Sequence, residues 1–166
     1  MKKKILLAIV AVLVVIQFIR PSRNLSTEVS ANDIAKHYTV PDNVQTLLKT
    51  ACYDCHSNNT VYPWYSNVQP VGWWLENHVN GGKEKLNFSE FTTLEGKRQF
   101  KKLNNVIHEI KDGGMPLDSY LWIHKDAKLS ETDKNTLMTW AQGLQKEVII
   151  QYHLSKEDID SIMQKR

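Results

Sequence analysis

The two cysteines of this chain, Cys52 and Cys55, stand three residues apart, and His56 follows the second one directly. Two thiols at this spacing followed by a histidine form the attachment pattern for c-type haem. Each thiol can form a thioether with one vinyl group of the porphyrin, and the histidine then lies under the iron as its proximal ligand. The pattern therefore predicts one covalently bound haem c per chain, with His56 bound to its iron.

The same cysteine pair is compatible with other chemistry. In an oxidising compartment it could form a disulfide or a redox-active dithiol. Thioredoxin-like chemistry would require a strand before the motif and a βαβ pattern around it, and neither is visible. A structural zinc site needs four ligands, whereas Cys52, Cys55 and His56 supply three. The dithiol and zinc interpretations stay open as minor alternatives to haem.

The chemistry of a haem depends on whether the chain supplies a second axial ligand. Met115 is the leading candidate, 59 residues after His56. It follows a glycine pair that can end a helix and turn the backbone close to the porphyrin, and Pro116 then stiffens the loop. A thioether ligand favours ferrous iron and raises the reduction potential. Met115 is therefore expected as a metal ligand rather than as a gap-filling core methionine.

Other side chains could compete for this position. Three histidines are rival distal ligands: His78, His108 and His124. Met138 and Met163 lie in segments with helical periodicity and are interpreted as packing residues. The five tryptophans are expected to line a haem pocket, to pack in the core, or both.

Helical periodicity and capping signals recur along the chain without a convincing strand pattern, so we expect an all-α fold. The first helix should begin near Asp42 and carry the cysteine motif at its C-terminal end, and a second should span about residues 71–79. Further helix starts are indicated by capping boxes at Thr92/Glu95, Ser130/Asp133 and Ser155/Asp158, and helix ends by the glycine pairs 81–82 and 113–114.

The N-terminus resembles an export signal. Three lysines precede an apolar run of fifteen residues from Ile5 to Ile19, which is the pattern of a signal peptide or of a short membrane anchor. No small-x-small cleavage site follows, so an anchor in the inner membrane is favoured for residues 1–20. We expect residues 21–40 to form a tether, 41–148 a haem-binding domain on the periplasmic side, and 149–166 a helical extension.

The net charge of +3 gives a misleading picture of the domain. Five of the 21 basic residues precede position 24, whereas all 18 acidic residues follow it. A nucleic-acid partner is therefore not expected. A basic cluster on one helix face could dock an acidic redox partner or could be an ordinary solvated face, and it comprises Lys97, Arg98, Lys101 and Lys102.

Several segments resemble the haem-binding domain family of short bacterial cytochrome-c-like proteins. They are Cys52-Tyr-Asp-Cys-His-Ser-Asn-Asn-Thr-Val-Tyr-Pro-Trp-Tyr65, Gly72-Trp-Trp-Leu-Glu-Asn-His-Val79, residues 86–91, Met115-Pro-Leu-Asp-Ser-Tyr-Leu-Trp-Ile-His124 and residues 129–134. The resemblance covers roughly residues 40–146. It implies a compact, exported, all-α monohaem domain with Cys52 and Cys55 as attachment points, His56 as proximal ligand and Met115 as distal ligand.

Two functions are compatible with these residues. The first is electron transfer by a membrane-tethered carrier that exchanges electrons with redox partner proteins in the cell envelope and is not an enzyme. The alternative is a haem-based sensor or peroxidase-like enzyme with an open or displaceable distal position, in which His108 or His124 would supply acid–base chemistry. A weaker third hypothesis is a binding module that haem stabilises.

Overall fold

The computed structural model describes residues 1–164, and all regular structure in this range is helical. The α-helices are α1 (Lys2–Ile16), α2 (Ile34–His37), α3 (Asp42–Ala51), α4 (Tyr53–His56), α5 (Val71–Lys85), α6 (Gly96–Asp112), α7 (Asp118–Leu121), α8 (Glu131–Tyr152) and α9 (Lys156–Gln164). Short 3₁₀ helices connect some of them, namely η1 (Trp64–Asn67), η2 (Phe88–Thr93) and η3 (Lys125–Ala127). The expected all-α fold class is therefore confirmed.

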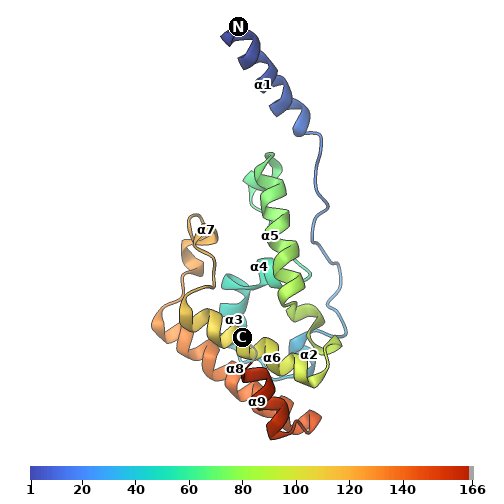
Figure 1. The fold of residues 1–166 in the computed structure, drawn as a ribbon, viewed down its shortest axis with the longest axis vertical. Helices are drawn as coiled ribbons and strands as arrows, with labels where there is room; N and C mark the ends of the chain where they lie inside the picture. Colours follow the sequence, from blue (N-terminus) through green and yellow to red (C-terminus); the bar gives the residue numbers. More distant parts are fainter. Residues whose placement is uncertain (165–166) are drawn as a thin grey trace.

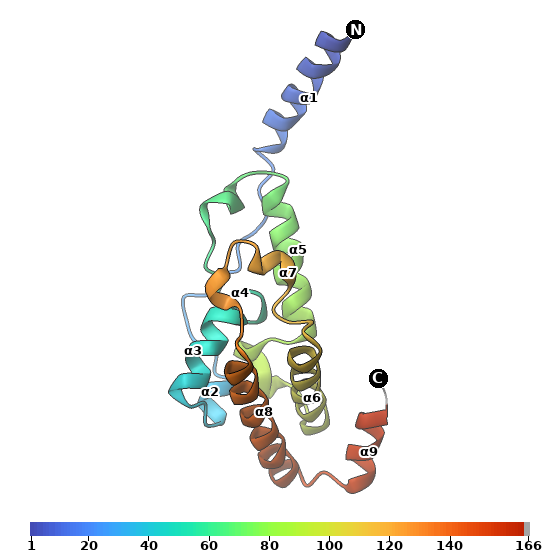
Figure 2. The same cartoon turned by 90° about the vertical axis from the view of Figure 1, so that its left-hand side faces the viewer.

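The body of the molecule is built on α6 and α8, which pack side by side (Figures 1 and 2). They run antiparallel, because Gly96 at the start of α6 lies against the ring of Tyr152 at the end of α8. A Cβ on Gly96 would overlap that ring, so the glycine permits the close approach. α3 packs against α8 and α9 packs against α6, while α5 extends beyond this pair (Figure 1).

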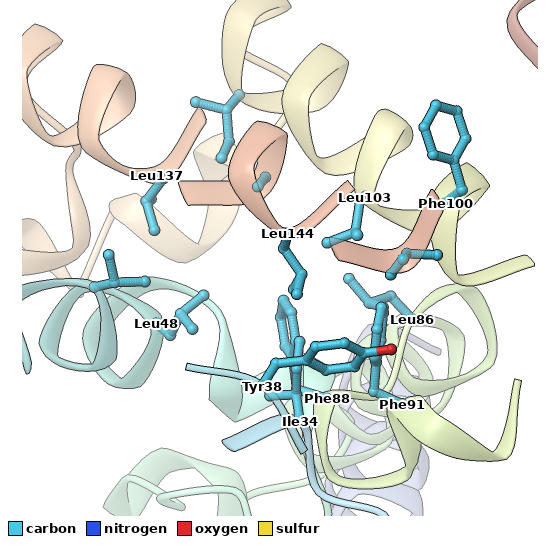
Figure 3. Close-up of a cluster of buried hydrophobic side chains, with 14 residues drawn as sticks. Ile34, Tyr38, Leu48, Leu86, Phe88, Phe91, Phe100, Leu103, Leu137 and Leu144 are labelled. Atoms are coloured by element: carbon cyan, nitrogen blue, oxygen red, sulfur yellow. The ribbon is translucent and has the colours of Figure 1, made fainter. Parts of the chain in front are cut away.

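The hydrophobic core lies where α3, α6 and α8 meet the short elements α2 and η2 (Figure 3). Its fully buried side chains include Leu48, Phe88, Phe91, Leu103 and Leu144. Burying each of these contributes roughly 1.5–3 kcal/mol relative to leaving it in water. The core thereby fixes the end of α3, which leads directly into the cysteine motif.

Residues 21–40, for which a tether was expected, are packed against the domain. Ile34 and Tyr38 are core residues, and Tyr38 donates a hydrogen bond of 2.6 Å to Gln99 Oε1. Asn24 donates from its amide to the Ser57 carbonyl oxygen at 2.9 Å and accepts from the Thr60 N–H through its own backbone. The polar composition of residues 21–40 does not predict these contacts, because their partners are distant in the sequence.

α1 projects from the body at the end where α5 begins (Figures 1 and 2). None of its side chains is buried. Within residues 1–164, no helix combines the length and the apolar character that crossing a membrane requires. The fifteen residues of α1 rise only about 22 Å against a hydrocarbon core of about 30 Å. The expectation that residues 1–20 form a spanning anchor is therefore not supported.

The local helix signals have mixed outcomes. The capping box of Ser130 and Asp133 is present at the start of α8, and Gly113 ends α6 with φ 75° in the left-handed region. In contrast, the glycine pair 81–82 lies inside α5 and does not end it. α6 begins after Glu95, which makes no side-chain cap, so the expected Thr92/Glu95 box is wrong.

The expected domain limits fall inside helices or packed segments. α8 continues through residue 148, the expected end of the domain, and stops at Tyr152. The extension that follows forms α9, whose Asp158 makes a 2.6 Å ion pair with Lys97 on α6. Its expected capping pair is formed, because Ser155 and Asp158 exchange hydrogen bonds of 3.2 Å between side chain and backbone.

Candidate functional site

The cysteine motif occupies its own helical turn. α3 ends at Ala51, and Cys52 leaves helical geometry with φ −128° before α4 begins. The turn is closed by the N–H of His56, which donates to the Cys52 carbonyl oxygen at 2.9 Å. The expectation that one helix carries the whole motif is therefore corrected to two helices with a break at the first cysteine.

His56 is oriented by a backbone carbonyl from the end of α5. Its Nδ1 lies 2.9 Å from the Leu86 carbonyl oxygen. Because a carbonyl can only accept, Nδ1 must carry the proton, and the lone pair of the neutral ring is on Nε2. The partner lies thirty residues after His56, so the end of α5 sets the orientation of this ring.

The environment of His56 favours the uncharged imidazole. Burial lowers the pKa of this side chain, and the hydrogen bonds to the Leu86 and Gly82 backbone oppose that shift. A metal ligand must be the neutral ring, and a carbonyl partner on its second nitrogen fixes both orientation and tautomer. The geometry of His56 is therefore suited to iron.

α5 passes so close to the motif that only a glycine fits at the contact. A Cβ built on Gly82 would lie 2.5 Å from the Cys55 carbonyl oxygen and 3.0 Å from its Cβ. A glycine at this point lowers the stability of the helix, because glycine has more backbone freedom than alanine in the unfolded chain and loses it on folding. The glycine that the sequence suggested as a helix end therefore serves as a contact point between α4 and α5.

Met115 lies at the same cavities as the motif. One cavity of about 310 Å³ and a second of about 340 Å³ are both lined by Cys52, His56, Met115 and Pro116. Cys55 lines the first of them. The structure thus brings together all four residues predicted as the site, although Met115 and His56 are 59 positions apart.

The loop before Met115 is held by the end of α6. The Glu109 carbonyl oxygen accepts from the N–H groups of Gly114 at 2.8 Å and Met115 at 3.2 Å. A Cβ on Gly114 would overlap the Glu109 carboxylate. The two glycines therefore have separate tasks: Gly113 supplies the left-handed turn, and Gly114 the close approach.

The three rival histidines differ in position. His78 lines the 310 Å³ cavity, and its Nδ1 lies 2.8 Å from the Trp74 carbonyl oxygen. His124 is engaged elsewhere, with its Nε2 3.0 Å from the Tyr65 hydroxyl. His108 does not line either cavity that contains His56 and Met115. Of the three, His78 is the one whose position competes with that of Met115.

A polar network joins the motif to the loop after Met115, and sequence reasoning missed it. Tyr120 donates to Asp54 Oδ2 at 2.8 Å, while Asp54 Oδ1 accepts from the Val61 N–H at 2.9 Å. The Tyr120 ring stacks on His124 with centroids 4.1 Å apart. Burial and the Asp54 carboxylate raise the pKa of Tyr120. Tyr120 lies on α7 and His124 in the loop after it, and their spacing of four residues was the available signal for the stacked pair.

Cationic side chains lie at the other side of the site. Lys85 and Lys102 line the 340 Å³ cavity together with Asn105, and the Lys102 ammonium donates to the Lys85 carbonyl oxygen. Burial lowers the pKa of Lys102, and the nearby charges of Lys85, Lys101 and Arg98 lower it further. The cluster predicted on α6 is therefore divided, because Lys102 turns to the cavity and Lys97 pairs with α9.

Three of the tryptophans line a further cavity of about 520 Å³, namely Trp64, Trp74 and Trp122. This cavity shares Cys55, Asp54 and His78 with the 310 Å³ cavity. The other two lie elsewhere: the Trp73 indole donates to the Ile19 carbonyl oxygen and the Trp140 indole to that of Thr39. None of the five lines either cavity that contains both His56 and Met115, so the structure does not support the haem-pocket interpretation for them.

The thiols lack the character of a reactive dithiol. Burial raises the pKa of Cys52 to about 12, and the nearby Cys55 adds to this shift. Burial also raises the pKa of Cys55 to about 11, with a further contribution from the charge of Asp54. Redox-active pairs instead depress the pKa of the attacking thiol. In the part of the chain that the structure describes, no three His, Cys, Asp or Glu side chains converge in metal-binding geometry. Apolar walls with two neutral thiols and one neutral imidazole fit a covalently bound porphyrin.

The comparisons with known proteins support haem as the bound group. A family model described as a haem-binding domain matches residues 11–143. The match begins well before the segments on which the resemblance was based and includes residues 21–40, which the structure packs against the domain. No curated protein and no solved structure matches the chain.

Proposed function

The chain belongs to the haem-binding domain family, and we propose that it carries one c-type haem and acts as an electron carrier. Cys52 and Cys55 would attach the porphyrin, and His56 and Met115 would be the axial ligands. The observation that carries the proposal is the arrangement of His56: its Nδ1–H is bound to Leu86, and both His56 and Met115 line the same two cavities.

Covalent attachment would use the two partly buried thiols. Each S–H would add across one vinyl double bond, so that sulfur would bond to one vinyl carbon and the hydrogen would go to the other. The thioethers are uncharged, which suits walls that already hold the thiols neutral. Cys52, at the break in the helix, and Cys55, in α4, both line the 310 Å³ cavity.

The surrounding residues would orient the group and exclude water. Phe88, Val106 and Leu129 supply apolar wall in the 340 Å³ cavity. Lys85 and Lys102 line the same cavity and would hold the haem carboxylates by charge. When bound, the haem supplies an iron that alternates between ferric and ferrous forms, and a histidine–methionine pair is the ligand set of electron-transfer cytochromes.

We further propose that the domain functions outside the cytoplasm, on the periplasmic side of the inner membrane, and exchanges electrons with redox proteins of the envelope. The support is the basic N-terminus followed by the apolar residues of α1, which is the pattern of an export signal.

A second candidate function is supported by His78. This residue lines the 310 Å³ cavity, and with Nδ1 at the Trp74 carbonyl its Nε2 carries the lone pair. A histidine beside an open distal position is what a peroxidase-like enzyme or a ligand sensor would need. In that function Met115 would be displaceable or would not bind the iron.

Absorption spectra of oxidised and reduced protein, before and after carbon monoxide, separate the two functions. Wild-type protein should be low-spin, should show the methionine-to-iron charge-transfer band and should not bind carbon monoxide readily. Met115→Ala should keep its covalent haem, lose the band and bind carbon monoxide. Met163→Ala, at an exposed methionine on α9, is the matched control. A high-spin wild type, or an unchanged band in Met115→Ala, would overturn His56/Met115 ligation.

A further inference from the structure

A group of large apolar side chains lies exposed around the 520 Å³ cavity. It consists of Val61, Trp64, Val71, Trp74, Trp122 and Ile123, which we call the aromatic face. Two of its tryptophans are largely exposed to solvent, Trp64 by 78% and Trp122 by 71%. Contiguous apolar surface of this kind on a soluble domain usually marks a site of interaction.

The aromatic face lies at the end of the body from which α1 projects. η1, the start of α5 and the loop after α7 all lie toward this end (Figures 1 and 2). The junction is held by hydrogen bonds, since Gln17 Nε2 donates to the Gln69 carbonyl oxygen at 3.1 Å and Gln17 Oε1 accepts from the Gln69 N–H at 2.9 Å. The apolar surface of α1 and the aromatic face are therefore on the same end of the molecule.

The charges at this end complement an anionic surface. Lys2, Lys3, Lys4, Arg20 and Arg23 carry positive charge, and the first acidic residue of the chain is Glu28. Arg23 is held at η1, because its guanidinium lies 4.9 Å from the centroid of the Tyr62 ring and donates to Asn67 Oδ1. Basic residues next to an apolar surface are attracted to membranes that contain anionic lipids.

We propose that the aromatic face docks on the surface of an anionic lipid bilayer. Indole rings prefer the level of the lipid headgroups, where the apolar ring is buried and the N–H stays hydrated. This association requires only that α1 and the aromatic face lie in the interface, so it does not depend on a spanning helix. Because Cys55 lines both the 310 Å³ cavity and the 520 Å³ cavity, docking turns the attachment edge of the haem site toward the bilayer.

Vesicle partitioning of the full-length haem protein tests the proposal. The probes are vesicles of phosphatidylcholine with or without phosphatidylglycerol. The test variant is Trp64→Ser with Trp122→Ser, and the matched control is Val29→Ser with Ile150→Ser, at two exposed apolar residues outside the aromatic face. We expect the wild type to bind anionic vesicles. Binding should weaken about tenfold in the test variant, because it lacks the two indoles that the bilayer interface would bury, and it should be unchanged in the control.

Two results would overturn the proposal: equal partitioning of wild type and test variant, and equal weakening in the control variant. If equal partitioning is accompanied by a loss of electron exchange with a soluble redox protein, the aromatic face is assigned to a protein partner. Haem content and absorption spectrum are measured in every variant, so a failure of axial ligation is distinguished from a failure of lipid docking.

Discussion

The hydroxyl of Tyr120 lies 2.8 Å from Asp54 Oδ2, which joins the loop that carries the candidate distal ligand to the motif that carries the proximal one. Asp54 stands between the two cysteines, and Tyr120 is five residues after Met115. One hydrogen bond to a carboxylate therefore spans the two halves of the site. It offers a way to test how the distal loop is held without changing any predicted ligand.

Tyr120→Phe should loosen the distal loop while leaving the haem attached. Losing a partly buried hydrogen bond to a carboxylate should cost about 1.5 kcal/mol of unfolding free energy, which denaturant titration would measure. Carbon monoxide should bind the ferrous variant faster, because Met115 leaves the iron more often. Tyr152→Phe is the control, since its hydroxyl accepts from Gln99 far from the site. Equal carbon monoxide rates in the two variants would contradict the positioning role.

Gly82→Ala should impair haem incorporation. The added Cβ would meet the Cys55 carbonyl oxygen at 2.5 Å, so α4 and α5 would have to separate at the motif. Gly143→Ala, inside α8, is a matched control, because nothing lies within 4 Å of its Cβ position and Gly143 lines neither cavity of the site. The control should raise stability by about 0.5–1 kcal/mol through helix propensity. Haem per polypeptide and the thermal midpoint would be measured, and a harmless Gly82→Ala would show that the contact is not required.

Lys102→Gln should lower the reduction potential. A positive charge at the cavity stabilises ferrous over ferric iron, and its loss should shift the midpoint by on the order of −20 to −50 mV, given screening by solvent. Lys111→Gln, at an exposed position near the end of α6, should change it much less. Spectroelectrochemical titration gives both values. Identical shifts in the two variants would mean that Lys102 does not lie near the haem.

The contact between α9 and α6 should weaken in acid. The hydrogen bond from Lys97 is the largest cause that lowers the pKa of Asp158. A carboxyl whose pKa is lower in the folded state than in the unfolded state stabilises the fold. Its full contribution is present at pH values above the unfolded pKa, near 4, and is lost as the pH falls through the lower pKa of the folded state. Protection factors for amide exchange in α9, corrected for the intrinsic exchange rate at each pH, should fall between pH 6 and pH 3 more in the wild type than in Asp158→Asn. An equal fall in both proteins would refute the ion pair's contribution.

Features that depend on neighbouring residues could be predicted from the sequence. The Ser130/Asp133 box and the helix end at Gly113 are examples, because both use hydrogen bonds or dihedral angles within a few positions. The cysteine motif is local in the same sense, and it indicated where to look for the site.

Features that depend on distant contacts could not be predicted. Gly82 has the local signature of a helix end, but its place is decided by Cys55. The partner of His56 is Leu86, thirty residues later, and pattern alone could not select that carbonyl. Residues 21–40 resemble a linker in composition, yet Ile34 is buried in the core. In each case packing in three dimensions overrides the local preference.

The last turn of α5 constrains how this site could change in length. Gly82 touches Cys55, the Leu86 N–H donates to the Gly82 carbonyl oxygen at 2.9 Å, and the Leu86 carbonyl holds His56. One inserted residue between positions 82 and 86 would rotate everything after it by about 100° around the helix axis. The altered helix could not keep both the Gly82 contact with Cys55 and the Leu86 hydrogen bond with His56. Insertions and deletions are therefore excluded from this one turn.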